Sequence, residues 1–183
     1  MKSKLYLLLA FVFVMASCAT RESEGPLAAD VILKTAQKQA RKKGKNVFIM
    51  WHASWCGWCH RMDSLMNDED VKQYFDDSFI IEHMVVKENE KNKYLENPGA
   101  AELLATYNGD KAGIPFWVVL DKKGNLIADS FMRPEGVGLD EPGQNTGCPA
   151  RQDEVDYWIK VLKTTTDISD EGLVKIAAKF LKK

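Results

Sequence analysis

The chain of 183 residues has few cysteines and no excess of basic side chains. Its four cysteines are too few to form the disulfide framework of a small secreted scaffold at this length. Lysine and arginine number 25 against 26 acidic residues. Such a balance provides no basic surface for nucleic acid, and we expect no nucleic-acid partner. The sequence also lacks internal repeats and a long Ser/Gly/Pro-rich linker, which argues against a second domain.

Long hydrophobic runs are missing as well. The longest apolar stretch, Leu5–Ala16, has twelve residues, whereas a membrane-spanning helix needs about 20. Lys2 and Lys4 precede this stretch and Ser17 follows it, which is the pattern of a signal peptide. We therefore expect the mature protein to be exported.

The end of this segment, Met15-Ala16-Ser17-Cys18, resembles the lipobox of bacterial lipoproteins, in which a cysteine is lipidated and becomes the new N-terminus. The resemblance implies a signal peptide at residues 1–17, a tether at 18–27 that is lipid-anchored through Cys18, and a folded domain at 28–183. It also implies a location on the periplasmic side of a bacterial membrane. Ordinary secretion, with Cys18 as an incidental thiol, is the alternative.

The rest of the sequence alternates between helical and strand patterns. Asn46–Ala53 is a short and nearly continuous apolar run, which is typical of a strand buried on both faces. Apolar residues at helical spacing begin just after it, so a strand runs directly into a helix at Cys56. The predicted helices are Ala28–Lys43, Cys56–Asn67, Asp68–Asp77, Ala100–Tyr107, Glu154–Leu162 and a last one capped by Ser169 and ending at Leu181; the predicted strands are Asn46–Ala53, Phe79–Val86, Ile114–Leu120 and Leu126–Phe131.

Two cysteines lie at this junction, in the sequence Trp55-Cys56-Gly57-Trp58-Cys59. The thiolate is the nucleophile in disulfide exchange, so the reaction needs a sulfur whose ionised form is stabilised near neutral pH. A helix N-terminus offers unpaired backbone N–H groups and a partial positive charge to Cys56, whereas Cys59 lies one turn inside the helix. We therefore expect Cys56 to attack a substrate disulfide and Cys59 to resolve the mixed disulfide.

The cysteine motif, together with Asn97-Pro98-Gly99 and Gly113-Ile114-Pro115, resembles the thioredoxin superfamily over about residues 28–162. The resemblance implies an α/β thioredoxin-like fold, with a central mixed sheet flanked by helices and an extra C-terminal helix. It implies a thiol-disulfide oxidoreductase that acts on protein thiols and disulfides and exchanges electrons with a membrane donor or acceptor. No cofactor and no metal are expected.

The resemblance also assigns roles near the cysteines. The Ile114–Pro115 bond is expected to be cis and to face the disulfide, so that the backbone of Ile114 pairs with a substrate strand. Trp55 and Trp58 flank the thiols and are expected to form an apolar rim that contacts substrate, with Gly57 between them. Trp51 and Trp117 are expected in the core instead.

The sequence departs from the family pattern at two places. Thioredoxins have a buried aspartate six residues before the first active-site cysteine, and Met50 stands there. Glu82 or a histidine is the candidate substitute for this acid. Between the cysteines, Gly57-Trp58 replaces Gly-Pro, and the reduction potential depends on that dipeptide.

Two segments show neither helical nor strand pattern. Lys87–Asn97 is charged and lacks periodicity, so we expect a solvated surface insertion. Met132–Pro149 is rich in glycine and proline and longer than a simple connection requires, which is typical of functional loops. We expect it to fold over the end of the sheet that carries the cysteines and to narrow access to Cys56.

Other interpretations of the cysteines stay open at this point. Cys56-x-x-Cys59-His60 also matches the attachment signature of c-type haem. A zinc site would need Cys148 and a histidine, His52, His60 or His83, to complete the cysteine pair. A thioredoxin fold used only for partner binding would keep the pair as a static disulfide. Cys148 is expected to be a buried inert thiol and His60 an exposed helical residue, whereas His52 either lines the site or packs.

Overall fold

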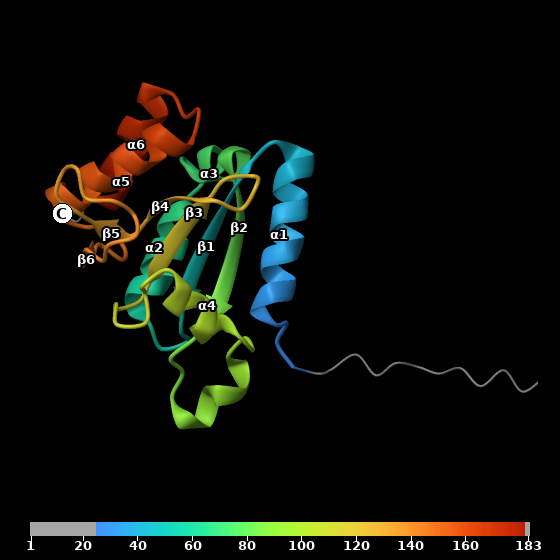
Figure 1. The fold of residues 1–183 in the computed structure, drawn as a ribbon. Coiled ribbons are helices and arrows are strands. Elements are labelled where there is room, and N and C mark those ends of the chain that lie inside the picture. The colour runs from blue at the N-terminus through green and yellow to red at the C-terminus, as the bar shows by residue number, and fades with distance from the viewer. Residues whose placement is uncertain (1–24, 182–183) are drawn as a thin grey trace, which may run out of the picture.

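The computed structural model of the protein describes residues 25–181, and the predicted signal peptide and Cys18 lie outside that range. Its central sheet contains four strands in the order β2–β1–β3–β4 (Figure 1). β1 is parallel to β2 and antiparallel to β3, and β3 is antiparallel to β4. The strands are β1 at Asn46–His52, β2 at Phe79–Val85, β3 at Phe116–Leu120 and β4 at Leu126–Asp129. The mixed sheet expected from the resemblance is therefore confirmed.

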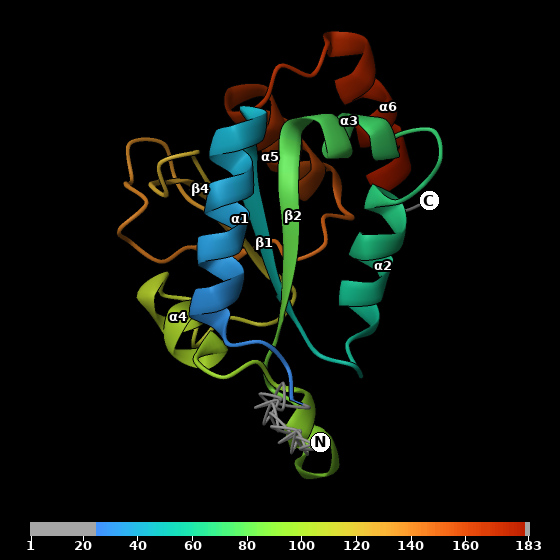
Figure 2. The same cartoon turned by 90° about the vertical axis from the view of Figure 1, so that its right-hand side faces the viewer.

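Helices cover both faces of the sheet (Figures 1 and 2). Alternating side chains of β1 divide between two cores: Phe48 and Met50 belong to one, and Val47, Ile49 and Trp51 to the other. The strand is thus buried on both faces, as its apolar run predicts. The first core packs against α2 (Gly57–Met66), α3 (Lys72–Ser78), α5 (Gln152–Thr165) and α6 (Asp170–Phe180), and the second against α1 (Ala29–Lys43) and α4 (Ala100–Thr106).

The extra C-terminal helix, α6, completes the first core. The hydroxyl of Ser169 accepts a hydrogen bond from the backbone N–H of Gly172 (3.2 Å), so the predicted cap is confirmed. Phe180, at the other end of α6, is fully buried and packs against Phe75 and Trp158. Within residues 25–181, no helix has the length and apolar content to cross a bilayer.

Several predicted boundaries were wrong. The acidic segment starting at Asp68 first forms a turn, because its carboxylate accepts from the N–H of Asp70 (3.1 Å), and the helix begins only at Lys72. α5 begins at Gln152, before the predicted start, because the carboxylate of Glu154 caps its N-terminus.

Both irregular segments contain regular structure that the sequence did not predict. A 3-10 helix, η1, covers Glu90–Leu95. β5 (Phe131–Met132) pairs with β6 (Gln144–Asn145), so the predicted strand over Leu126–Phe131 is split after Asp129 and the long loop is partly a hairpin.

Candidate active site

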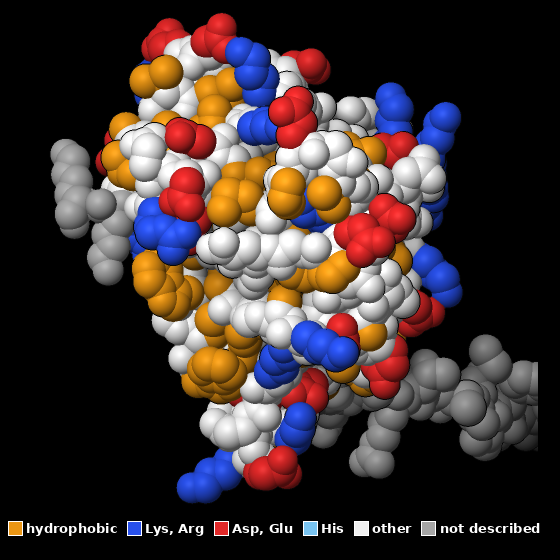
Figure 3. Space-filling view, turned by 60° about the vertical axis from the view of Figure 1, so that its left-hand side comes forward, with side chains coloured by type: hydrophobic (Ala, Val, Ile, Leu, Met, Phe, Trp, Pro, Cys, Tyr) orange, Lys and Arg blue, Asp and Glu red, His pale blue; other side chains and the backbone are white. Residues whose placement is uncertain are grey.

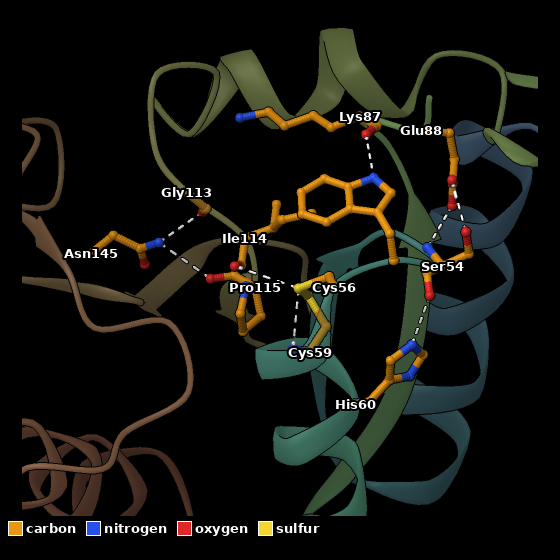
Figure 4. The surroundings of a disulfide bond; sticks show 11 residues. Ser54, Cys56, Cys59, His60, Lys87, Glu88, Gly113, Ile114, Pro115 and Asn145 are labelled. Carbon is orange, nitrogen blue, oxygen red and sulfur yellow. Dashed lines mark hydrogen bonds between the residues drawn. A yellow bond between two sulfur atoms is a disulfide. The ribbon is translucent and has the colours of Figure 1, made fainter. Parts of the chain in front are cut away.

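The cysteine pair lies where β1 leads into α2 (Figure 4). Cys56 is the N-cap of α2, Cys59 lies in its first turn, and the two form a disulfide. The backbone N–H of Cys59 points at the Cys56 sulfur at 3.2 Å. The helix therefore directs one of its N-terminal N–H groups at the Cys56 sulfur, which favours the thiolate form of this cysteine. In this disulfide form both side chains are nearly buried, at 3% and 1% exposure, so exposure alone does not distinguish attacker from resolver.

The loop before β3 lies against the disulfide (Figure 4). The Ile114–Pro115 peptide bond is cis, which is the geometry that the resemblance implies. The Cys56 sulfur lies 3.6 Å from the carbonyl oxygen of Ile114. Ala53 and the two cysteines form a small apolar cluster on which Ile114 packs. The sequence thus identified both chain segments that meet at the disulfide.

Two tryptophans border the pair. Trp55 and Trp58 are 56% and 47% exposed, as expected for rim residues, whereas Trp51 and Trp117 are fully buried. A Cβ added at Gly57 would meet nothing within 4 Å, so the space above this residue is open. On the face shown in Figure 3, hydrophobic side chains form several separate patches, at the centre and along the left side of the molecule.

A cavity of about 730 Å³ opens beside the disulfide. Trp58, Ile114 and Pro115 line one part of it, and the end of the long loop, residues 145–148, lines another. This end of the loop is fixed, because the buried indole of Trp117 donates to the carbonyl of Gly147 (2.8 Å). The segment Met132–Pro149 therefore reaches the site through its last residues, and the narrowing of access to Cys56 stays a prediction.

Cys148 belongs to this cavity wall. Its side chain is 5% exposed, and burial raises the pKa of its thiol to about 11. A thiol with so high a pKa is almost wholly protonated at neutral pH. The structure therefore agrees with the expected inert thiol.

The face of each strand decides which side chains reach α2. Met50 is buried in the core beneath α2. Glu82 points to the same face of β2 as Ile80 and Met84, because side chains two positions apart on a strand share a face. Ile80 and Met84 belong to the core on the α1 side of the sheet. Glu82 is therefore on the wrong face to replace the missing aspartate beside Cys59. Its carboxyl lines a depression with Lys43 and Lys45 instead, and burial raises its pKa.

His60 lies on α2, and the other two histidines, His52 and His83, lie close to this helix. His52 is partly buried, and its ring packs edge-on against that of His83, with the ring centroids 5.4 Å apart. Burial, with a smaller contribution from His83, lowers the pKa of His52. His60 is exposed as predicted, yet its Nε2 lies 2.9 Å from the carbonyl oxygen of Ser54 and donates to it in the matching tautomer.

Sequence reasoning missed one carboxylate close to the cysteines. Glu88 is 5% exposed, although it lies in the segment predicted to be solvated. Its two oxygens accept from the backbone N–H (2.5 Å) and the hydroxyl (2.8 Å) of Ser54. The available signal was its position: Glu88 follows β2, and parallel strands β1 and β2 end at the same edge of the sheet.

Within residues 25–181, no three His, Cys, Asp or Glu side chains come together in a way that could hold a metal ion. The sulfurs of Cys56 and Cys59 bond to each other, and haem attachment would require this bond to be reduced and each sulfur to bond to an external group. The chemistry that the site supports is exchange of that disulfide.

Comparisons with known proteins agree with this fold. A family model described as thioredoxin-like matches residues 31–122, which include the cysteine pair and the cis-proline loop. No curated protein sequence matches the chain.

Among solved structures, similar chains include a disulphide isomerase from Xylella fastidiosa Temecula1, with 17% identity over 94% of this chain and 98% of that one and a TM-score of 0.48. The C-terminal domain of DsbD from Neisseria meningitidis shares 21% identity over 76% and 98%, with a TM-score of 0.44. An exposed lipoprotein thioredoxin from Streptococcus pneumoniae shares 22% over 59% and 83%, with a TM-score of 0.37.

Proposed function

The chain belongs to the thioredoxin-like family, and on that premise we propose that it is an extracytoplasmic thiol-disulfide oxidoreductase acting on protein disulfides through Cys56 and Cys59. The observation that carries the proposal is the position of the disulfide. It lies at the N-terminus of α2, with the Cys56 sulfur 3.6 Å from the carbonyl oxygen of Ile114 and a cavity beside it.

The reaction proceeds through two exchanges. The Cys56 thiolate of the reduced pair attacks a substrate disulfide, which forms a Cys56–substrate bond and releases one substrate thiolate that takes up a proton. The Cys59 thiolate then attacks the Cys56 sulfur, so the Cys56–Cys59 bond forms and the second substrate thiol leaves. The substrate gains two electrons and two protons, and the cysteine pair is oxidised. The reverse sequence donates a disulfide to a substrate dithiol.

The substrate is bound across the two loops at the disulfide. The backbone of Ile114, ahead of Pro115, pairs with an extended substrate strand. Trp55 and Trp58 contact its apolar side chains, and Gly57 leaves room above the sulfurs. The exposure of both tryptophans supports these roles, because large apolar side chains left in contact with water frequently mark sites of interaction.

Location and partner follow from the N-terminal sequence. Residues 1–17 are a signal peptide, Cys18 carries the lipid, residues 18–27 form the tether, and residues 28–183 form the domain, on the periplasmic side of a bacterial membrane. A membrane electron donor or acceptor restores the pair after each turnover. The basic, apolar and small-residue pattern ending at Cys18 supports this part of the proposal.

Insulin reduction with dithiothreitol as electron donor tests the activity. The wild-type chain should accelerate insulin reduction, and Cys56→Ser and Cys59→Ser should each lower it to background. Cys59→Ser should also trap mixed disulfides with substrates, whereas Cys56→Ser should trap none. A wild-type chain that leaves the insulin rate unchanged would identify a binding module with a static disulfide instead.

Fractionation of cells that express the full chain tests the anchor. The wild-type protein should sediment with membranes, and Cys18→Ser should be released to the soluble exported fraction. A wild-type protein recovered in the soluble exported fraction would contradict lipid anchoring. Cys148→Ser is the matched control, and its distribution should equal that of the wild type.

A further inference from the structure

Glu88 holds the turn that leads into Cys56 (Figure 4). Its two carboxylate oxygens take both hydrogen-bond donors of Ser54, and its own backbone N–H donates to the carboxylate of Glu96 at 2.7 Å. A carboxylate is costly to bury unless hydrogen bonds compensate the lost hydration, and Ser54 provides that compensation here. The fixed residue lies two positions before the attacking cysteine.

Lys87, the preceding residue, contacts the other loop. Its backbone carbonyl accepts from the indole N–H of Trp55 (2.9 Å). Its ammonium group donates to the carbonyl oxygens of Ala112 (2.7 Å) and Asp110 (3.1 Å), just before the cis-proline bond. The φ angle of Lys87 is 57°, a left-handed conformation that residues other than glycine seldom adopt. Consecutive residues after β2 thus bridge the cysteine turn and the cis-proline loop.

The relative position of these two loops matters for the proposed reaction. A protein substrate must place its disulfide at Cys56 while its backbone pairs with Ile114, so both loops must be aligned at the same moment. A displacement of about 1 Å can cost on the order of 100-fold in rate when reacting groups must be aligned. A small disulfide that contacts only Cys56 has no such requirement.

We propose that Lys87 and Glu88 are positioning residues that align the cysteine turn with the cis-proline loop for protein substrates. This inference rests on the proposed oxidoreductase function and adds the device by which protein disulfides are preferred to small ones. Neither residue touches the reacting sulfurs, so the effect passes through Ser54, Trp55 and the loop before Ile114.

The test compares two substrates of the full chain: insulin, and bis(2-hydroxyethyl) disulfide as a small disulfide. Glu88→Ala and Lys87→Met should each lower kcat/KM for insulin about tenfold, with less than a twofold change for the small disulfide. Glu88→Gln should restore most of the insulin rate, because its amide oxygen still accepts from the Ser54 N–H and its amide nitrogen can donate to the Ser54 hydroxyl. Glu90→Gln and Lys91→Met, exposed neighbours with the same changes of charge, should match the wild type.

The outcomes separate this inference from the proposed function. A wild-type chain inactive on both disulfides would refute the function itself. If the wild type is active, an equal loss on both substrates would show that Glu88 only stabilises the fold, and an unchanged insulin rate would show that it positions nothing. Lys87→Met decides the matter if Glu88→Ala fails to fold, because it removes only exposed side-chain contacts and leaves the buried carboxylate in place.

Discussion

The two irregular segments beside the cysteine pair, residues 87–97 and 132–149, differ in composition and yet reach the same loop (Figure 4). Lys87 of the first segment donates to the carbonyls of Asp110 and Ala112, and Asn145 of the second donates to those of Gly113 and Pro115. The loop before β3 has no strand partner for these carbonyls, so side-chain donors take the place of a strand. The position of a single donor side chain therefore determines which loop such a segment contacts, and its overall composition does not.

The segments differ in how each is held. Hydrogen bonds hold the first at several points, including the buried carboxylate of Glu88, the ammonium group of Lys87 and the side-chain amide of Asn97. The second has a paired hairpin and an ion pair at its start, in which the guanidinium of Arg133 donates to both carboxylate oxygens of Asp129 (2.8 and 2.6 Å) with both side chains almost fully buried. We therefore expect losses of stability to be concentrated in the second segment.

The largest effect should come from Arg133→Ala. The change leaves the carboxylate of Asp129 buried without its charge partner, and the free energy of unfolding should fall by about 3 kcal/mol or more. Urea unfolding followed by circular dichroism measures it. Lys34→Gln is the control, because the Asp30–Lys34 pair is exposed to solvent and should contribute little to the free energy of unfolding. A loss below 1 kcal/mol for Arg133→Ala would contradict the expectation that the second segment contributes more to stability than the first.

The next effect concerns Cys148, at the end of the second segment. Burial raises the pKa of its thiol from an ordinary 9.0 to about 11, so at pH 7.5 its thiolate is about 100-fold scarcer than that of an exposed cysteine. Alkylation by iodoacetamide, followed by mass spectrometry of the Cys148 peptide, should be slower in the native protein by about that factor than in urea. The native rate should rise about tenfold per pH unit up to about pH 11. Equal alkylation rates in the native and the denatured protein would show that the Cys148 thiol is accessible to solvent in the folded state.

A smaller effect should follow from Asn145→Ala. The change removes two donor contacts to the cis-proline loop and the acceptor for the N–H of Gly147, so unfolding free energy should fall by about 1–2 kcal/mol. Gln144→Ala, at the exposed neighbouring position of β6, should leave stability within about 0.5 kcal/mol of the wild type. Identical results for both variants would mean that only the first segment supports the loop.

The smallest effects are expected at the most exposed apolar side chain of each segment, Tyr94 and Val137, which are 71% and 42% exposed. Replacement of either by serine should change the free energy of unfolding by less than about 0.5 kcal/mol in the same urea experiment. A loss above 1 kcal/mol at one position would show that its side chain packs in solution.

Sequence patterns predicted the parts of the site that depend on local order. Local sequence alone predicted three elements: the apolar strand β1, the helix that starts at Cys56, and the Ile114-Pro115 segment. In the structure they meet at the disulfide, as expected. The position of Glu88 after β2 was a signal, but its burial could not be predicted because it depends on donors of Ser54, which lies 34 residues away in sequence. The prediction that Glu82 replaces the missing aspartate was wrong. Which face of the sheet Glu82 lies on depends on the register between β2 and β1, and the sequence of one strand does not reveal that register.

The first helix starts at the same end of the sheet as the cysteines, because α1 and β1 run in opposite directions (Figure 2). Hydrogen bonds hold this start, from the Asn97 amide to the Leu27 carbonyl and from the Ala29 N–H to the Pro98 carbonyl (both 2.8 Å). The ten residues from Cys18 to Leu27 can reach at most about 35 Å. The lipid proposed on Cys18 would therefore hold the reactive end of the domain within that distance of the membrane surface, and protein disulfides close to the surface would be the accessible substrates.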